Sequence, residues 1–424
     1  MKALITGATG FVGSHLVDKL LEKNYEVYCL KRKTSSTKWL DGKNIKYVEG
    51  DLFSNEALEN CIKDMDYVFH IAGVVKAKTK QGFIHGNYDS TKNLLEITER
   101  ANPNIKKFIF VSSLAAVGPA KTEVPVDENT VPAPITTYGE TKLKAEEAVY
   151  SYKDKFPISI IRPPAVFGPR DSEILIYFKT FAGGLNSVIG FDTKYLSLVY
   201  VEDLADGIIL AAENEIANSQ KYFLCFDKAY NWNEIGDLTS KILGKKAFKI
   251  RLPHSVIYSV GYLAELFSTF SSKPATLNIE KCKDITQLRW ICSNEKAKKE
   301  LGYKPKFTLE ESFKKTIEWY KEIEKKYRVE GNYVKLSGLL GDMAVCYRRM
   351  GNIQLSIKTN RKAIEESQKA GDTISIYRWC QNLAGILMRN KDYEAAFPYL
   401  RLSLYASAKL ADPNEIKLSA SALF

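Results

Sequence analysis

Short β-rich runs and helical patterns alternate through residues 1–165, and this alternation constrains the fold more than any other feature. The β-rich runs lie at residues 2–6, 26–30, 45–50, 67–73, 107–113 and 158–164. Helical patterns lie between them and after them, at residues 13–24, 55–65, 90–101 and 141–155. Strands and helices that alternate at this spacing form βαβ units, with parallel strands and helices on both faces of the sheet. The sequence therefore predicts an α/β fold with a doubly wound parallel sheet.

The first β-rich run leads into a helix through a turn with three glycines, in the segment "ALITGATGFVGSHL". A helix that begins directly after a strand presents unpaired N–H groups and the positive end of its dipole, which favour a phosphate. We expect Gly7 to permit the turn, Gly10 to let a diphosphate approach the backbone, and Gly13 to let the helix pack on the strand. This context predicts a dinucleotide-binding site rather than an ordinary loop.

The rest of the chain divides into two further parts. Residues 166–327 are more irregular and end in a helical block at residues 294–326. After residue 327 the sequence is helical, with no strand signal. We predict a dinucleotide-binding domain over residues 1–165, to which later segments return. A small interleaved substrate-side domain over residues 166–327 and an all-α tail over residues 328–424 complete the prediction.

The tail repeats itself at an offset of 40 residues. The stretch "AVCYRRMGNIQLSIKTNRKAIEES" matches "AGILMRNKDYEAAFPYLRLSLYAS". Such a period, with two helices per unit, predicts a helical solenoid and resembles tetratricopeptide repeats, although the usual Trp and Pro positions are absent. An unrelated pair of helical hairpins is the alternative. We expect apolar side chains to be buried between the stacked helices, including Leu339, Ile357, Leu383, Ile386, Phe397 and Leu400.

Two full repeat units are visible, whereas such stacks usually need about three for stability. We therefore expect the tail to contact the first domain, a protein partner or a second copy of the chain. Every predicted cofactor or catalytic position precedes residue 327, so the tail is not expected to do chemistry.

Several motifs resemble those of the extended short-chain dehydrogenase/reductases, which include the NAD-dependent epimerase/dehydratase family. "TGATGFVG" resembles their TGxxGxxG fingerprint. The likeness continues through "GDL", "HIAG", "VSSLAAVG", "YGETK" and "RPPAVFGPRD", over about residues 1–325. The resemblance implies a Rossmann-type sheet and a nicotinamide dinucleotide cofactor. The cofactor contacts that it implies are Gly7, Gly10, Phe11, Val12, Gly13, Asp51, Leu52, Ala72, Tyr138, Lys142 and Pro164.

The end of the second β-rich run bears on which cofactor binds. An acidic residue there would bind the ribose hydroxyls of NAD, whereas a basic residue accommodates the 2′-phosphate of NADP. The segment "CLKRKTSS" contains three basic residues and no acid. Arg32 occupies the position where related reductases place a phosphate-binding arginine, with a solvated basic loop as the alternative reading. We predict NADP as the preferred cofactor, with NAD as the alternative.

Proton transfer in this family depends on a tyrosine, which needs its reference pKa of about 10 lowered to work near neutral pH. A lysine one helical turn further on supplies a positive charge, and Tyr138 and Lys142 have this spacing. Tyr88–Lys92 and Tyr405–Lys409 share it, but only Tyr138 follows a serine at the family's distance. That serine is Ser113, with Ser112 as the neighbouring alternative. The resemblance also implies a structural or proton-relay role for Asn87, for which helix capping or packing is the alternative.

The reaction class is narrowed by what the family's anchor positions contain. Dehydratases carry an Asp-Glu pair where Leu114 and Ala115 stand, and sugar-nucleotide epimerases carry anchors where Ala165 and Ser197 stand. We predict an NADP(H)-preferring oxidoreductase that interconverts a hydroxyl and a carbonyl on an apolar small molecule. Such substrates are typical of dihydroflavonol-4-reductase-like and hydroxysteroid-dehydrogenase-like members. The alternatives are a sugar-nucleotide epimerase and a non-catalytic NADP-binding scaffold.

The remaining features predict no further ligands. The formal charge is +11, but lysines alternate with glutamates as on a solvated helix, so no nucleic-acid partner is expected. Seven cysteines without CxxC pairing indicate reduced thiols and no metal site, and with no leader segment in view a cytoplasmic protein is expected. The most apolar stretch, residues 254–270, contains His254 and Glu265 and is read as a partly buried helix rather than a membrane span.

Overall fold

The computed structural model describes residues 1–268, 278–349 and 353–410, and its contacts group the chain into two compact units. The first unit contains Met1–Gly168 and Leu185–Phe313. The second contains Pro169–Gly184 and Lys314–Phe424.

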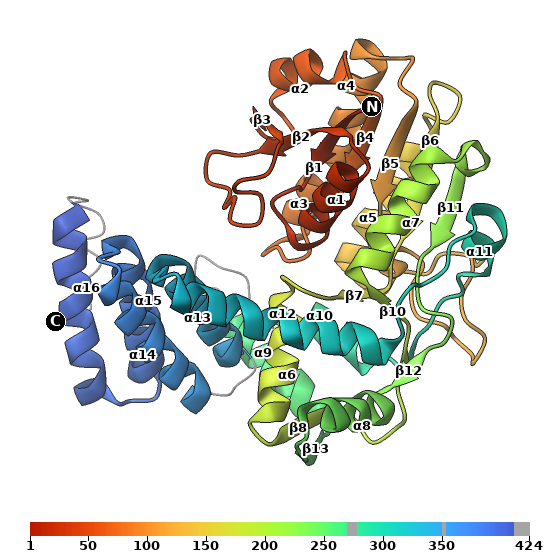
Figure 1. The fold of residues 1–424 in the computed structure, drawn as a ribbon. Helices are drawn as coiled ribbons and strands as arrows, with labels where there is room; N and C mark the ends of the chain where they lie inside the picture. The colour runs from red at the N-terminus through yellow and green to blue at the C-terminus, as the bar shows by residue number, and fades with distance from the viewer. Residues whose placement is uncertain (269–277, 350–352, 411–424) are drawn as a thin grey trace. The chain divides into compact units, whose positions relative to one another are not determined.

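A seven-stranded sheet forms the centre of the first unit (Figure 1), in the order β11-β6-β5-β4-β1-β2-β3 with every neighbouring pair parallel. Its strands are β1 (Lys2–Thr6), β2 (Glu26–Lys31), β3 (Lys46–Glu49), β4 (Tyr67–His70), β5 (Lys107–Val111), β6 (Ile158–Arg162) and β11 (Gln220–Phe223). All six predicted β-rich runs contain a strand, and the seventh returns from beyond residue 166. The predicted doubly wound, Rossmann-type fold is confirmed.

Helices cover both faces of this sheet. One face is covered by α1 (Phe11–Glu22) and α7 (Val201–Glu213), together with α11 (Glu295–Leu301). The other is covered by α2 (Asn55–Ile62), α4 (Ser90–Ala101) and α5 (Thr137–Tyr150). Because both faces are covered, the central strands are mostly apolar, and β5 is buried along its whole length.

Short elements complete the first unit. Three small sheets pair β7 (Ala165–Phe167) with β10 (Leu198–Tyr200), β8 (Leu185–Ile189) with β13 (Phe248–Leu252), and β9 (Tyr195–Leu196) with both β12 (Tyr230–Asn231) and β14 (Arg289–Trp290). The helices are α3 (Lys80–Phe83), α8 (Trp232–Leu243), α9 (His254–Ser268) and α10 (Ile279–Thr286), with a π-helical turn at Ile84–Asp89 and 3₁₀ turns at Leu114–Ala116 and Glu215–Ala217.

The second unit is helical throughout its described residues. It contains α6 (Ser172–Ala182), most of α12 (Leu309–Val329), α13 (Tyr333–Arg349), α14 (Ile353–Lys369), α15 (Thr373–Arg389) and α16 (Tyr393–Leu410). The first residues of α13 and α15, and those of α14 and α16, are 40 residues apart, so the sequence offset is a structural one.

The predicted core of the tail is largely correct. Leu383, Ile386 and Leu400 are buried, and Leu339 and Ile357 are partly buried against them. The prediction for Phe397 is wrong, because its side chain is 54% exposed. The reason is that it lies on the outer side of α16, the last helix of the described chain, where no described helix follows to cover it.

Contacts cross the boundary predicted at residue 327. Leu175 of α6 shares one apolar core with Leu336 and Leu340 of α13, and the Tyr320 hydroxyl of α12 donates to the Asp171 carbonyl at 2.6 Å. An amphipathic helix such as α6 does not show in its sequence what it packs against. The three-part division therefore stays a prediction, while these contacts assign α6 to the helical unit.

Candidate active site

The predicted site residues meet at one edge of the sheet. In a parallel sheet the carboxyl ends of all strands lie on the same edge, which is where ligands bind in open α/β sheets. Each of the following residues comes within two positions of the end of its strand: Arg32 after β2, Asp51 after β3, Ala72 after β4, Ser113 after β5 and Pro164 after β6. The glycine turn follows β1 on the same edge.

The glycine turn leaves no room for side chains. Gly7 has a φ of +75°, and a Cβ atom there would lie 2.7 Å from the Ala72 nitrogen. A Cβ atom on Gly13 would lie 2.2 Å from the Gly7 carbonyl oxygen, so the helix approaches the strand backbone as closely as expected. Gly10 is the N-cap of α1 and supplies no capping side chain. The turn thus presents a helix N-terminus over bare backbone, which fits the diphosphate of a dinucleotide.

The basic residues after β2 differ in their partners. Lys31 and Lys33 both lie near the Glu49 carboxylate, at 3.9 and 3.5 Å. Arg32 is exposed and forms no ion pair with any carboxylate of the described chain. Asp51 is occupied locally, because its Oδ1 accepts from the Phe53 N–H at 2.9 Å and from the Ser54 hydroxyl at 3.0 Å. The unpaired positive charge at this end of the site is therefore that of Arg32.

The serine and the tyrosine lie together. Ser113 caps the 3₁₀ turn after β5, where its hydroxyl accepts from the Ala115 N–H at 3.1 Å, and it lies close enough to the Tyr138 hydroxyl in the first turn of α5 to lower the pKa of that phenol. Gly139 makes this approach possible, because a Cβ atom there would lie 2.3 Å from the Ala115 carbonyl oxygen. Ser112, the alternative, is buried, and its hydroxyl has no hydrogen-bond partner among the described residues. The geometry favours Ser113.

Lys142 lies one helical turn after Tyr138 in α5 and is buried. Its ammonium donates to the Val111 carbonyl at 2.7 Å and lies 4.1 Å from the centre of the Phe110 ring. Burial lowers the pKa of Lys142 to about 7, against the opposing charge of Glu146. Glu146 is itself held by Arg162 in a fully buried ion pair of 2.6 Å.

One electrostatic expectation is wrong for the protein without ligands. The pKa of Tyr138 is raised above its ordinary value rather than lowered, because burial outweighs the hydrogen bond from Ser113. Lys142 points its ammonium at a backbone carbonyl, and its own burial disfavours the charge that was expected to act on the tyrosine.

Asn87 connects three segments around the site. It lies in the π-helical turn and is buried. Its Oδ1 accepts from the Val74 N–H at 2.7 Å, and its Nδ2 donates to the Val74 carbonyl at 3.0 Å and to the Thr141 hydroxyl at 3.1 Å. A Cβ atom on Gly73 would lie 3.2 Å from Asn87 Oδ1 and 3.7 Å from Lys142 Nζ. Asn87 thus ties the loop after β4 to the helix that carries Tyr138.

Four further predicted cofactor positions lie at the ends of β4 and β6 and in the first turn of α1. Ala72 donates its N–H to the Thr6 hydroxyl at 3.3 Å, which holds the end of β4 against β1. Pro164 is half-buried and follows Pro163, whose carbonyl accepts from the Leu114 N–H at 2.8 Å. Phe11 and Val12 are half-buried in the first turn of α1.

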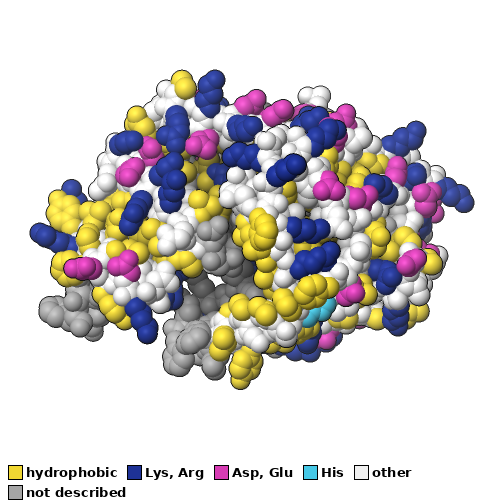
Figure 2. All heavy atoms as spheres, turned by 90° about the horizontal axis from the view of Figure 1, so that it is seen from below, with side chains coloured by type: hydrophobic (Ala, Val, Ile, Leu, Met, Phe, Trp, Pro, Cys, Tyr) yellow, Lys and Arg dark blue, Asp and Glu magenta, His cyan; other side chains and the backbone are white. Residues whose placement is uncertain are grey.

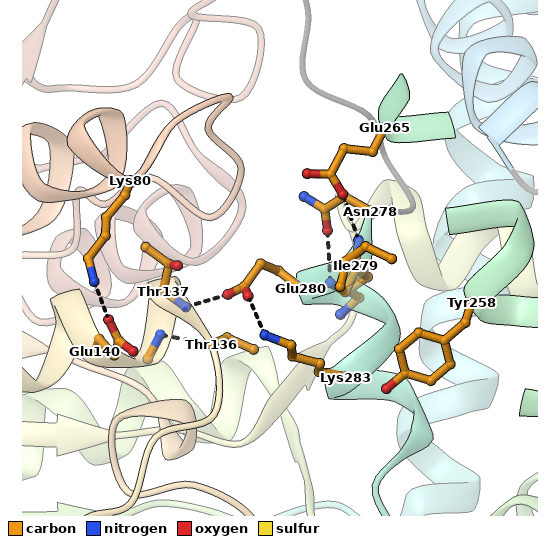
Figure 3. A network of polar contacts seen from close by, with 12 residues as sticks. Lys80, Thr136, Thr137, Glu140, Tyr258, Glu265, Asn278, Ile279, Glu280 and Lys283 are labelled. Atoms are coloured by element: carbon orange, nitrogen blue, oxygen red, sulfur yellow. Dashed lines mark hydrogen bonds and ion pairs between the residues drawn. The ribbon is translucent and has the colours of Figure 1, made fainter. Parts of the chain in front are cut away.

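One residue of the site carried no sequence signal. Glu280, in α10, accepts from the Thr137 N–H at 2.5 Å, directly before Tyr138, and it also pairs with Lys283 at 3.0 Å (Figure 3). Burial opposes ionisation of Glu280, but these two hydrogen bonds outweigh it and lower its pKa. A carboxylate is favoured at this place because it faces the positive end of the α5 dipole.

The described residues contain no group of three or more His, Cys, Asp or Glu side chains arranged to hold a metal ion. Among them, no helix is both long and apolar enough to cross a bilayer.

Comparison with known proteins identifies the class to which this site belongs. Residues 3–225 match the NAD dependent epimerase/dehydratase family, so the chain belongs to that family. It is an enzyme of the extended short-chain dehydrogenase/reductase type, and its cofactor is a nicotinamide dinucleotide.

Individual relatives cover about three quarters of the chain. A ceramide reductase of Caulobacter vibrioides is 29% identical over 75% of this chain and 93% of that protein. The decarboxylating sterol-4-alpha-carboxylate 3-dehydrogenase of Mus musculus is 27% identical over 76% of this chain and 92% of that protein. The structure of a UDP-glucose 4-epimerase from Thermotoga maritima shares the fold, with a TM-score of 0.63 and 24% identity over 76% of this chain and 99% of that one.

Proposed function

We propose that this enzyme is an NADP(H)-preferring oxidoreductase that interconverts a hydroxyl and a carbonyl on an apolar, lipid-like substrate, with Ser113, Tyr138 and Lys142 as its catalytic residues. The observation that carries the proposal is the placement of Ser113 beside Tyr138 at the cofactor edge of the sheet, one helical turn from the buried Lys142. The ceramide reductase and the sterol dehydrogenase support a lipid-like substrate.

The proposed mechanism assigns one task to each side chain. The nicotinamide ring supplies the hydride acceptor or donor when it is bound. In oxidation the ionised Tyr138 takes the proton of the substrate hydroxyl, and in reduction its phenol returns that proton to the carbonyl oxygen. Ser113 donates a hydrogen bond to the same oxygen and orients it. Lys142 holds the cofactor ribose and, by its positive charge, favours the ionised form of Tyr138.

Asn87 is proposed as a positioning residue. Its three hydrogen bonds fix the loop after β4 relative to α5, so that Gly73 and Lys142 keep their spacing. The alternative role in proton relay requires its side-chain amide to exchange these partners.

A sugar-nucleotide epimerase is the second candidate, since such an enzyme shares the fold. The anchor positions argue against it. Ala165 offers no polar side chain, and the Ser197 hydroxyl is buried and engaged with the Cys292 backbone at 3.0 and 3.3 Å. A non-catalytic scaffold would not require Ser113 and Tyr138 to lie side by side.

The helical unit is proposed as a tetratricopeptide-like module that binds a protein partner or a second copy. The recurrence of both helices after 40 residues supports a repeat. The outer side of α16 exposes Tyr393, Phe397 and Tyr405, at 64, 54 and 61%. Sedimentation analysis of the full chain with and without Phe397→Glu tests whether that side mediates self-association.

Arg32 is expected to set the cofactor preference. Arg32→Asp should weaken NADPH binding by about 10- to 100-fold and strengthen NADH binding, because a charge-assisted hydrogen bond to the 2′-phosphate is lost. Lys33→Gln is the matched control and should leave the preference unchanged, since Glu49 already balances Lys33. Calorimetric titration of both cofactors gives the four affinities. Equal or tighter binding of NADH by the unmutated protein would contradict the prediction.

Glu280 is expected to act on the catalytic tyrosine through its negative charge, which lies beside the first turn of α5. Glu280→Gln keeps an acceptor for the Thr137 N–H but removes a negative charge close to Tyr138. The pKa of Tyr138 should fall, so the rise of kcat/KM for alcohol oxidation should occur at lower pH. Glu140→Gln removes the carboxylate that lies in the first turn of α5 itself, faces Lys80 and is 45% exposed, and it should shift the profile less. An unchanged profile in Glu280→Gln would show that Glu280 is only structural.

A further inference from the structure

The outer face of α9 is apolar and exposed. Val256, Val260 and Leu263 are 44, 48 and 50% exposed and stand at positions i, i+4 and i+7, which lie on one side of a helix. The adjacent side of α9 is already packed. Ile257 is buried, and a Cβ atom on Gly261 would lie 2.4 Å from the Cys282 sulfur of α10. The exposed apolar row of α9 therefore faces away from the core, whereas the apolar side of an ordinary surface helix faces the core.

The apolar surface extends beyond α9. Phe248 and Ile250 on β13 are 74 and 36% exposed, and Phe191 is 67% exposed. Arg251 at the end of β13 donates to the Phe191 carbonyl at 2.6 Å, which holds the Phe191 loop beside this strand. Figure 2 views the molecule from below, where β8, β13, α8 and α9 lie, and hydrophobic side chains form a row across it. Large exposed apolar surfaces of this kind mark interaction sites.

Positive charge accompanies the apolar side chains. The segment "KKAFKIR" at residues 245–251 contains four basic residues and no acid. Glu265 is the only acidic residue of α9, and its carboxylate faces α10, where it accepts from the Ile279 N–H at 3.1 Å (Figure 3). An apolar helix face next to lysines and arginines is the combination that lies in the interface of an anionic bilayer.

The same elements reach the catalytic helix. The inner side of α9 packs on α10, where the Cys282 thiol donates to the Ile257 carbonyl, and Glu280 of α10 holds the Thr137 N–H. One layer of helix thus separates the exposed apolar face from the backbone next to Tyr138. A lipid-like substrate that leaves a bilayer at α9 is delivered close to the site of reaction.

We propose that α9 and β13 form a docking surface for an anionic lipid bilayer, on which the protein lies without spanning it. That the substrate comes from this bilayer rests on the proposed function. Docking of the protein on the bilayer can be measured without turnover. A second copy of the chain is the competing occupant, but it would have to bring the basic segments of two copies together.

Vesicle binding tests the proposal directly. The full chain is mixed with vesicles of phosphatidylcholine and phosphatidylglycerol, or of phosphatidylcholine alone, and the bound fraction is measured by flotation without any substrate. We expect binding to the mixed vesicles and at least about tenfold weaker binding by the double variant Val260→Glu/Leu263→Glu. Val124→Glu/Ile216→Glu replaces two apolar residues elsewhere in the same unit that are more exposed, at 72 and 52%, and should bind like the unmutated protein.

The basic segment is tested separately. Lys246→Ala/Lys249→Ala should reduce the preference for phosphatidylglycerol, by about fivefold for each lysine. Absence of vesicle binding by the unmutated chain would overturn the proposal, as would equal binding by Val260→Glu/Leu263→Glu. Gel filtration could instead show a dimer that Val260→Glu/Leu263→Glu converts to a monomer, with no vesicle binding. That result would assign the face to a second copy of the chain and would also overturn the proposal. Turnover on a detergent-dispersed ketone should be unchanged in all three variants, which separates this outcome from failure of the proposed function.

Discussion

Replacing Tyr138 by phenylalanine is expected to lower turnover by about a thousandfold or more while NADPH binding stays within about twofold. The substitution removes one hydroxyl, which lies beside Ser113, and leaves the aromatic ring in its half-buried place. Steady-state kinetics on a reducible ketone and calorimetric titration of NADPH give the two quantities.

Two tyrosines with the same lysine spacing serve as controls. Tyr88 lies in the π-helical turn and Tyr405 in α16. Neither stands at the family's distance after a serine, as Tyr138 does after Ser113. Tyr88→Phe and Tyr405→Phe should retain nearly full turnover. Substantial activity in the Tyr138 variant would contradict the assigned mechanism.

Replacing Lys142 by methionine is expected to abolish turnover and yet to stabilise the cofactor-free protein near neutral pH. Burial lowers the pKa of Lys142 from 10.5 to about 7. Between these values the unfolded chain binds a proton that the folded protein does not, so stability rises with pH through this window. Below about pH 7 the full cost of burying the ammonium is present. Methionine fills the same space without a charge.

The size and pH dependence of this effect distinguish it from repacking. We expect the variant to be more stable by on the order of 2 kcal/mol at about pH 6.5, after the lost hydrogen bond to the Val111 carbonyl is subtracted. The gain should shrink toward pH 10. Urea unfolding at several pH values measures it. A gain that is the same at every pH, or a loss at pH 6.5, would contradict the assigned pKa.

Much of the cofactor edge could be predicted from the sequence because its signals are local. The glycines have to stand where a strand meets a helix, and the contacts of Gly7 and Gly13 show why side chains are excluded there. Ser113 and Tyr138 could be paired from their separation along the chain. Each of these positions is specified by neighbours within a few residues, or by a strand end that brings it to the common edge.

Other features depend on contacts that no local pattern encodes. Glu280 reaches Thr137 across 143 residues of sequence, and its own segment looks like a solvated helix. The helix α6 has an apolar side, but only the tertiary structure shows that this side belongs to the helical unit. Phe397 follows the repeat pattern and is nevertheless exposed, because the pattern does not show whether a covering helix follows.

The pKa values of Tyr138 and Lys142 could not be predicted from the sequence. A lysine one turn from a tyrosine suggests a lowered tyrosine pKa, yet Lys142 is buried and Tyr138 is half-buried, and burial dominates the pKa of each. Burial depends on the surrounding sheet and helices rather than on the spacing of the two residues. The sequence therefore predicted which groups meet, and not their protonation without ligands.

The measurement that tests the central claim most directly is the absorbance of NADPH during incubation with a long-chain keto lipid, a 3-ketosteroid and UDP-glucose. We expect oxidation of NADPH with at least one of the two apolar ketones, loss of that activity in Tyr138→Phe, and none with UDP-glucose. Conversion of UDP-glucose to its 4-epimer without net change in the cofactor, together with no oxidation of NADPH by either ketone, would contradict the claim and assign the enzyme to the epimerases.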